Sequence, residues 1–580
     1  MDQTETALNA ASAPVSDPDL ARLLKGIAAG PGAAVAPVAR MAEPPSLPEN
    51  EPVVDDPAAE EGAALSALDE VAEELQGRAT GLDGEAGAVL GALALMARDP
   101  DLRRRIGELA REGRPAAWAV HTACGSYQEL LLAAGGYLAE RAADLGDVRD
   151  RAVAVLLGLP MPGLPDPGHP YVLVARDLAP ADTVRLDPQR VKAIVTRLGG
   201  PTSHTVILAR SLGLPAVVGC QGAEHLVEGT LVAVDGDAGT VEREPSPERA
   251  ERFRERAQRR RALLTEAGGP GRTADGVPIA LLLNAGEGDP DEAAAHEGEG
   301  IGLLRTEFLF LDRADPPTVA EQTEAYARLF RAFAGRVVTV RTLDAGSDKP
   351  LDFAPTGAEA NPALGVRGFR TARPHPSLLL DQLTAIAAAE REASADGPCA
   401  RVRVMAPMVS TAAEAIAFAE MAHSAGIAEV GVMVEVPAAA LLAERLLCRV
   451  DFVSIGTNDL AQYTMATDRT LDSLPELLDP WQPALLHLLE RVGRAGERLG
   501  QPVGVCGEAA ADPLLAPVLV GLGATSLSMA APALPAVRYV LARHTQAECR
   551  RLAELALAAE DPQQARKVVR EASHPEAVLL

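Results

Sequence analysis

Apolar and polar positions divide the first half of the chain into two regions with different periods. From residue 63 to residue 159, alanine and leucine recur with spaced charges, as in LSALDEVAEEL at 65–75, and this spacing is typical of amphipathic helices. From 171 to 244, short apolar runs such as YVLV at 171–174 alternate with turns and predict a small α/β unit. Residues 25–40 are expected to pair with that unit, although the helical region separates the two in sequence.

A different alternation follows in the C-terminal half. The charged segment 245–266 predicts a linker helix, and its charge spacing fits both a solvated helix with i,i+4 ion pairs and a functional hinge. After it, short β-like runs alternate with helical stretches, and this alternation predicts a (β/α)₈ barrel. The eight runs are 278–283, 300–303, 337–341, 402–406, 430–434, 451–455, 503–506 and 525–528.

These patterns predict a multidomain α/β protein in which a helical subdomain is inserted in an α/β domain and a TIM-like (β/α)₈ barrel follows. A chain of 580 residues is too long for a single core, so several domains are also expected from its length. The predicted parts are a disordered tail at 1–24, an α/β domain with an acidic loop at 25–58 and 159–246, the helical subdomain at 59–158, a linker helix at 247–270 and the barrel at 271–580.

Charge narrows the range of partners. The chain has 81 acidic and 54 basic residues and a net charge of −27, which argues against nonspecific binding to nucleic acid or to an anionic membrane. Any anionic ligand must then be held by a local arginine cluster. The six cysteines lack metal-finger spacing, the first residues lack a secretory pattern, and no apolar run approaches the roughly 20 residues of a membrane-spanning helix. We therefore expect a cytoplasmic protein without direct membrane insertion.

One histidine lies where a turn opens a helix. The segment GGPTSHTVILAR at 199–210 places His204 after two glycines and after Thr202 and Ser203, both of which can cap a helix. A phosphate at this helix start would meet free N–H groups and the positive end of the helix dipole. A neutral imidazole nitrogen can act as a nucleophile, so His204 is a candidate phosphoryl carrier. A lone histidine beside a turn is more often structural, so this prediction depends on the rest of the chain.

Arginines recur at the ends of the predicted barrel strands. Arg305 follows the second run closely, and Arg341 ends the third. Arg367 and Arg469 are further candidates, in the segments NPALGVRG and TDR. Because barrel chemistry is found where strands end, and because guanidinium groups bind phosphate and carboxylate bidentately, this set predicts a ligand with more than one anionic group.

Carboxylates and a thiol also lie at the ends of predicted barrel strands. Glu435 and Asp459 follow consecutive runs and suit Mg²⁺, although a helix cap or an ion pair would also account for Asp459, which adjoins Asn458. Cys506 ends the seventh run, beside glycines. Most single cysteines only pack, but a thiol beside a reactive carbon can deliver or remove a proton.

Taken in order, these motifs resemble Enzyme I of the bacterial phosphoenolpyruvate-dependent sugar phosphotransferase system over nearly the whole chain. The segments that carry the resemblance are 199–210, 302–310, 432–437, 454–469 and 505–508, together with YLAERAAD at 137–144. The resemblance implies that phosphoenolpyruvate phosphorylates His204, and that the phosphohistidine then passes the phosphoryl group to the small carrier protein HPr with release of pyruvate, as the first step of sugar uptake.

The resemblance also implies roles for the strand-end residues. By similarity, Glu435 and Asp459 would hold Mg²⁺, and Cys506 would protonate the enolate to give pyruvate. The helical subdomain would bind HPr, and the barrel would form a homodimer. Because His204 must face the barrel and later HPr, a domain swing about 158–170 and 245–266 is expected. The residues implied in substrate binding are Arg305, Arg341, Asn458, Asp459 and Arg469, with Arg367 as a further candidate.

The sequence departs from the family pattern in three places. Pro201 stands where many relatives have a basic residue, which removes a favourable charge near the phosphohistidine. Ala179 stands where relatives often have a threonine that can fix the histidine tautomer, so another group or water must do so here. A glycine pair after the third run is reduced to Gly346 followed by Ser347, which is a mild change.

Two other classes fit parts of the pattern. Pyruvate phosphate dikinase and phosphoenolpyruvate synthase resemble the histidine and barrel motifs, but they need a nucleotide-binding domain, and only about 60 residues without a glycine-rich phosphate loop precede the helical region. A regulatory protein without turnover is expected to lack the histidine, a metal carboxylate or the thiol, all of which are present. The absence of a long N-terminal sensor domain favours the carbohydrate branch of the system over the nitrogen-regulatory branch, and the sequence does not specify the transported sugars.

Overall fold

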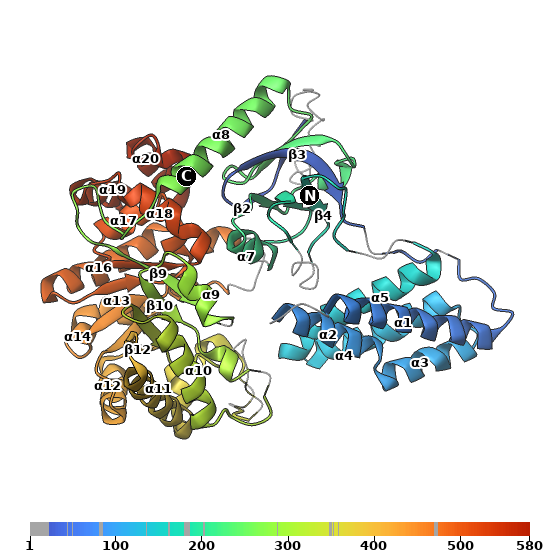
Figure 1. Cartoon of the computed structure of the whole chain (residues 1–580), viewed down its shortest axis with the longest axis horizontal. Helices are drawn as coiled ribbons and strands as arrows, with labels where there is room; N and C mark the ends of the chain where they lie inside the picture. The colour runs from blue at the N-terminus through green and yellow to red at the C-terminus, as the bar shows by residue number, and fades with distance from the viewer. Residues whose placement is uncertain are drawn as a thin grey trace, which may run out of the picture.

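The computed structural model describes residues 22–580 except 43–44, 49, 80–84, 135, 160–162, 179–185, 201–203, 287, 312, 347–350, 352, 356, 358 and 469–473. Figure 1 shows a helical domain, a mixed α/β domain and a large barrel domain that carries the C-terminus. The helical domain is inserted between strands of the α/β domain, and the barrel follows a long helix, α8.

The helical domain confirms the helices predicted from the amphipathic spacing. Leucine and alanine side chains from these helices share one buried core. Asp99 begins the third helix by accepting a hydrogen bond of 2.8 Å from the amide of Leu102. The helices of this domain in the described part of the chain are α1 (Pro57–Ala79), α2 (Glu85–Ala97), α3 (Pro100–Arg111), α4 (Ala116–Ala134) and α5 (Gly136–Leu157).

The α/β domain is built on one mixed sheet, with strand order β1-β8-β7-β3-β4-β5-β6-β2 among the residues described. Strand β3 lies between β4, to which it is parallel, and β7, to which it is antiparallel, so the segment 25–40 does pair with the later strands. The strands are β1 (Leu23–Lys25), β2 (Ile27–Gly30), β3 (Ala33–Arg40), β4 (Tyr171–Ala175), β5 (Val191–Thr196), β6 (Ala216–Val218), β7 (Leu231–Asp235) and β8 (Thr240–Arg243), with helices α7 (His204–Ser211) and η2 (Ala223–His225).

The start of the α/β domain differs from the sequence prediction. Strand β1 begins at Leu23, inside the segment predicted as a tail, because Leu23 and Leu24 pair with Glu242 and Val241 at the edge of the sheet. A short edge strand is specified by its neighbour rather than by its own residue pattern.

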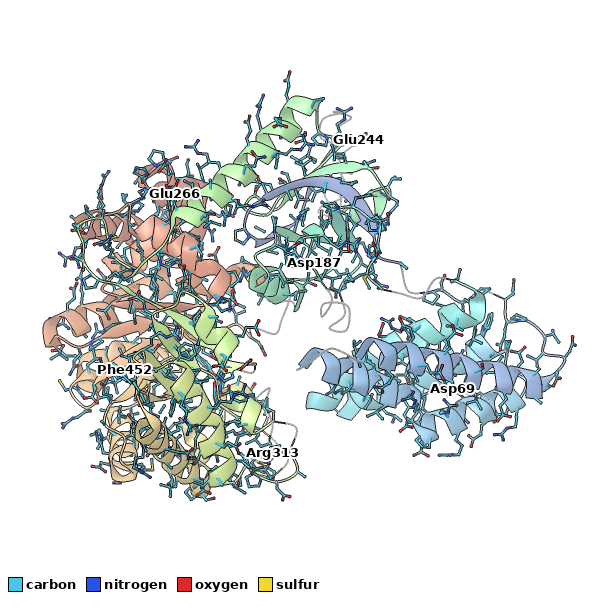
Figure 2. All side chains as sticks on the ribbon, in the orientation of Figure 1. Asp69, Asp187, Glu244, Glu266, Arg313 and Phe452 are labelled. Carbon is cyan, nitrogen blue, oxygen red and sulfur yellow. The ribbon has the colours of Figure 1, made fainter. Side chains whose placement is uncertain are left out.

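Helix α8 (Pro247–Glu266) joins the α/β domain to the barrel domain, and Glu244 and Glu266 mark its two ends in Figure 2. Arg256 forms ion pairs of 2.5 and 2.6 Å with Asp235 and Asp237 of the α/β domain. Leu263 packs against barrel-domain residues such as Tyr539. The linker is therefore a helix packed at both ends, and it stops at Glu266 rather than at residue 270.

The C-terminal domain is a closed barrel of parallel strands, which confirms the predicted (β/α)₈ architecture. In the part of the chain that is described, eight strands close when β16 pairs with β9. Their carboxyl ends therefore meet at one mouth. The strands are β9 (Ala280–Ala285), β10 (Gly300–Leu304), β11 (Val337–Arg341), β12 (Arg401–Ala406), β13 (Val430–Val434), β14 (Phe452–Ile455), β15 (Val503–Val505) and β16 (Ser526–Met529).

Helices cover the outside of the barrel. Thr318, Thr411 and Thr545 begin three of them with capping boxes, in which the threonine and a glutamate three residues later satisfy each other's backbone amides. The α-helices are α9 (Pro290–Ala295), α10 (Val319–Ala332), α11 (Pro376–Asp396), α12 (Ala412–Ala425), α13 (Pro437–Leu441), α14 (Ala443–Leu447), α15 (Thr457–Met465), α16 (Pro483–Leu499), α17 (Ala516–Gly521), α18 (Leu534–Leu541), α19 (Gln546–Leu557) and α20 (Pro562–Ala572).

Short 3₁₀ helices follow several strands of the barrel or connect its helices. They are η3 (Glu307–Leu309), η4 (Pro362–Leu364), η5 (Gly368–Ala372), η6 (Pro475–Leu478), η7 (Glu508–Ala511), η8 (Ala531–Ala533) and η9 (Ala577–Leu579). Within the described ranges, no helix combines the length and the apolar character needed to cross a membrane.

Candidate active site at the barrel mouth

Buried arginines and carboxylates meet where the barrel strands end. Arg341 is the last residue of β11, and its side chain is 8% exposed. Its Nη2 donates a hydrogen bond of 2.8 Å to Glu307, and its Nη1 lies 3.2 Å from the carboxylate of Asp344. The amide of Asp344 also donates to Glu307, at 3.0 Å. Glu307 therefore fixes both the guanidinium group and the loop that follows β11.

Arg367 links the segments that follow β11 and β14, although it lies outside the strands itself. Its Nη2 donates to Asp344 and its Nη1 donates to Asp459, each at 2.9 Å. Tyr463 accepts a third bond from Nη1 at 3.3 Å. The next residue, Gly368, has a φ of +55°, and a β-carbon there would lie 2.9 Å from the side chain of Met408. The glycine thus lets the chain turn close enough to bring Arg367 into the mouth.

Glu435 is a further buried carboxylate at the barrel mouth. Its side chain follows β13, is 1% exposed and accepts a hydrogen bond of 2.8 Å from the amide of Met408. Met408 has a φ of +61°, an unfavourable backbone conformation for a residue with a side chain, so local strain is retained where its amide meets Glu435. Burial, together with the charges of Asp459 and Asp344, raises the pKa of Glu435 well above its ordinary value.

The residues present fit a divalent cation of the Mg²⁺ type. Glu435 and Asp459 are both buried, and repulsion from the charge of Asp459 contributes to the raised pKa of Glu435. A cation between them would remove that repulsion. No cluster of three or more histidine, cysteine or acidic ligands suited to a metal occurs among the described residues, but Mg²⁺ commonly takes one or two protein carboxylates and fills its remaining positions with water and phosphate oxygens.

Cys506 follows β15 and points into the barrel. It is 4% exposed and packs in an apolar cluster with Leu303, Met405, Met433 and Phe452. Burial raises the pKa of its thiol to about 11, and a hydrogen bond with Ser454 together with the charges of Arg341 and Arg305 opposes the rise. The thiol is therefore protonated at neutral pH, the state required of a proton donor.

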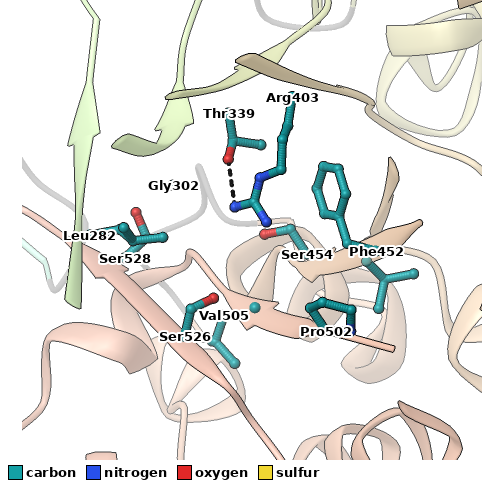
Figure 3. A pocket seen from close by; sticks show the side chains of 12 residues that line it. Leu282, Gly302, Thr339, Arg403, Phe452, Ser454, Pro502, Val505, Ser526 and Ser528 are labelled. Atoms are coloured by element: carbon teal, nitrogen blue, oxygen red, sulfur yellow. Dashed lines mark hydrogen bonds between the residues drawn. The ribbon is translucent and has the colours of Figure 1, made fainter. Parts of the chain in front are cut away.

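A small polar cavity lies inside the barrel near these strands (Figure 3). Ser454, Ser526 and Ser528 contribute hydroxyl groups to its lining, and Arg403 donates a hydrogen bond of 3.0 Å to Thr339 beside it. Its volume of about 20 Å³ suits one or two water molecules.

Two predicted substrate residues lie nearby in different settings. Asn458, in the first turn of α15, accepts a hydrogen bond of 3.0 Å through its Oδ1 from the amide of Glu508, which holds the start of η7 against α15. Arg305 is exposed directly after β10. Arg469 lies outside the described residues, as do Pro201, Ala179 and Ser347.

His204 is the first residue of α7, so it does start a helix. Its neighbour Thr205 is buried, and its hydroxyl lies 3.4 Å from Asp177, which anchors the first turn to the loop after β4. Figure 1 shows α7 between the sheet and the barrel domain. The histidine helix therefore stands beside the domain that carries the charged mouth.

Sequence reasoning missed the groups that orient this site. Glu307, Asp344 and Met408 have no role in the sequence-based prediction. The spacing of Asp344 three residues after Arg341 was the available signal. A buried arginine needs a carboxylate, and this one lies within reach on the same loop.

Comparison with known proteins places the chain in a family. Three models of the phosphoenolpyruvate-utilising enzymes match in order: the N-terminal domain at 25–141, the mobile domain at 167–239 and the phosphoenolpyruvate-binding domain at 262–546. A solution structure of Enzyme I is 31% identical, covers 41% of this chain and 99% of its own, and has a TM-score of 0.37.

Relatives along nearly the whole chain give the same result. A phosphoenolpyruvate-protein phosphotransferase of Streptomyces coelicolor is 50% identical, over 94% of this chain and 98% of its own. Relatives of the same name are 41% identical in Haloferax volcanii, over 86% and 89% of the two chains, and 37% identical in Geobacillus stearothermophilus, over 92% and 96%. With half of its residues shared along nearly its full length, the chain belongs to the phosphoenolpyruvate-protein phosphotransferase family, the Enzyme I proteins.

Proposed function

We propose that this protein transfers the phosphoryl group of phosphoenolpyruvate to His204 and then to the carrier protein HPr, with release of pyruvate. The observation that carries the proposal is the buried arginine and carboxylate network at the mouth of a barrel that also holds a protonated thiol, beside a helix that begins with histidine. Family membership gives the reaction, and this arrangement gives each group a physical task.

Arg341 is proposed to bind the anionic groups of phosphoenolpyruvate, with Arg305, Asn458, Arg469 and Arg367. The Nε of Arg341 is buried and has no hydrogen-bond partner among the described residues, while its two terminal nitrogens contact Glu307 and Asp344. A buried donor without a partner is unusual, and a substrate oxygen would satisfy it. Because both carboxylates already hold the guanidinium group in place, little reorganisation is needed when the anion binds.

Glu435 and Asp459 are proposed to hold Mg²⁺, which when bound would neutralise the phosphoryl oxygens during transfer. Arg367 bonds to Asp459 through one nitrogen and to Asp344 through another. It therefore orients one metal carboxylate and contributes positive charge at the same place. The backbone amide of Met408 donates a hydrogen bond to Glu435 and so orients the second proposed metal carboxylate.

Cys506 is proposed to donate its proton to the methylene carbon of the enolate that remains after phosphoryl transfer. Burial in the apolar cluster keeps the thiol neutral until a carbon base is presented. Formation of the C–H bond yields pyruvate and leaves a thiolate, which takes up a proton from solvent before the next turnover.

His204 is proposed to accept the phosphoryl group at the N-terminus of α7, where backbone N–H groups and the helix dipole favour an anion. The group would then pass to HPr docked on the helical domain. A homodimer formed through the barrel and a cytoplasmic location belong to the same proposal, by family membership.

The proposal is tested with the purified protein, phosphoenolpyruvate, Mg²⁺ and HPr. We expect one pyruvate per phosphoryl group on HPr, measured by a coupled dehydrogenase assay and by the intact mass of HPr. His204→Ala should abolish both products, because it removes the acceptor while leaving the barrel unchanged. Pyruvate formed without phosphorylated HPr, or unchanged transfer by the variant, would exclude the proposed relay.

Replacement of Cys506 should slow the formation of pyruvate. Because a positioned general acid contributes roughly 10²- to 10⁴-fold to a rate, we expect Cys506→Ala to lower kcat by a factor in this range. Circular dichroism should show that the variant is folded. Cys549→Ala is the matched control, since Cys549 is also buried in the barrel domain and has a thiol whose pKa is raised by burial. Equal effects of the two substitutions would assign Cys506 to packing alone.

Loss of one proposed metal carboxylate should change the metal requirement. For Glu435→Gln we expect the Mg²⁺ concentration at half-maximal activity to rise by on the order of tenfold or more, and chelation should inactivate the parent protein reversibly. Glu444→Gln, at an exposed glutamate paired with Arg498 on the barrel surface, serves as control. A variant at position 435 with unchanged Mg²⁺ dependence would show that this carboxylate does not bind the metal.

A further inference from the structure

The helix that begins with His204 contacts the barrel through an arginine. Arg210 lies in the last turn of α7, and its Nε donates a hydrogen bond of 3.0 Å to the carbonyl oxygen of Ala29 in β2. This bond fixes the guanidinium group of Arg210 to the sheet of the α/β domain. Its Nη1 donates to the carboxylate of Glu508, in the barrel domain.

Glu508 belongs to the part of the barrel mouth where the proposed chemistry takes place. It is the first residue of η7 and lies two positions after Cys506. Its backbone amide donates to Oδ1 of Asn458, at 3.0 Å. One residue therefore contacts the histidine domain through its side chain and a proposed substrate residue through its backbone.

A second contact lies next to the first. Gly213 follows α7, and a β-carbon built on it would lie 3.7 Å from the side chain of Pro532, in η8. Because η7 follows β15 and η8 follows β16, the C-terminal end of α7 rests on the loops of two adjacent barrel strands. His204 lies six residues before Arg210, about 9 Å along the helix at 1.5 Å per residue. These two contacts thus hold the C-terminal end of α7, the helix that begins with His204, against the barrel domain.

The strength of the ion pair suits a contact that must form and break. The side chains of Arg210 and Glu508 are 40% and 48% exposed, so water screens their attraction. Pairs of this kind typically shift an equilibrium by about two- to fivefold. Such a contact can favour the docked position of the histidine domain without preventing its departure toward HPr.

We propose that Arg210 and Glu508 are positioning residues that dock the His204 helix on the barrel for phosphorylation by phosphoenolpyruvate. The inference rests on the proposed function, and it assigns the pair to the first of the two transfer steps. The second step takes place away from the barrel and should not depend on the pair.

The test measures the two steps separately in the full-length protein. Single-turnover phosphorylation by phosphoenolpyruvate with Mg²⁺ is followed by rapid quench and intact mass, and transfer from the phosphorylated protein to HPr is followed by the mass of HPr. Glu508→Gln should slow the first step by about two- to fivefold. Arg210→Glu and Glu508→Arg should each slow it more strongly, since they replace attraction by repulsion. The double variant should recover to within about twofold of the parent.

Controls separate docking from general damage. Arg498→Glu reverses one charge of an exposed pair within the barrel domain and should leave both steps unchanged. Higher salt should slow the first step of the parent and have little effect on that of Glu508→Gln. Single variants with an unchanged first step, no recovery in the double variant, or an equal loss in transfer to HPr would each overturn the proposal. A parent protein that is not phosphorylated at all would instead contradict the proposed function.

Discussion

The burial of opposite charges at the barrel mouth is the constraint on which the site depends. The side chains of Arg341, Arg367, Asp344 and Asp459 are each less than 10% exposed. A buried charge without a partner costs several kcal/mol, and breaking such a pair typically costs about 3–5 kcal/mol. The loop after β11, the first turn of α15 and the residue that precedes η5 are thereby held in one arrangement, because each supplies a member of the network.

A network of this kind prepares the site for an anionic substrate. Its arginines are fixed by carboxylates before any ligand arrives, so their positive charge need not be reoriented during the reaction. Burial and the neighbouring carboxylates Asp459 and Asp344 raise the pKa of Glu435, and a cation is proposed to bind where these groups meet. The neutral thiol of Cys506 packs in an apolar cluster, within electrostatic reach of Glu435 and Arg341. One barrel mouth thus brings the groups proposed to bind a phosphate close to the group proposed to supply a proton.

Much of this arrangement could be predicted from the sequence, because it follows from short periodic elements. The apolar runs predicted the barrel strands to within a few residues. They also placed Arg341, Glu435 and Cys506 at or directly after strand ends and Asp459 a few residues beyond one, while the roles of these residues remain predictions. The partners of Arg367 could not be predicted, since they depend on how a loop without regular structure folds back across the mouth. The strained backbone of Met408 likewise has no signature in the residue pattern.

Division of the reaction between two domains is the central claim, and phosphorylation of the protein itself tests it most directly. The full chain would be incubated with phosphoenolpyruvate and Mg²⁺ in the absence of HPr, and its intact mass and fragmentation spectrum recorded. The account predicts one acid-labile phosphoryl group, located on His204 and removed when pyruvate is added in excess. No adduct on the folded protein, or an adduct on a residue of the barrel, would contradict it.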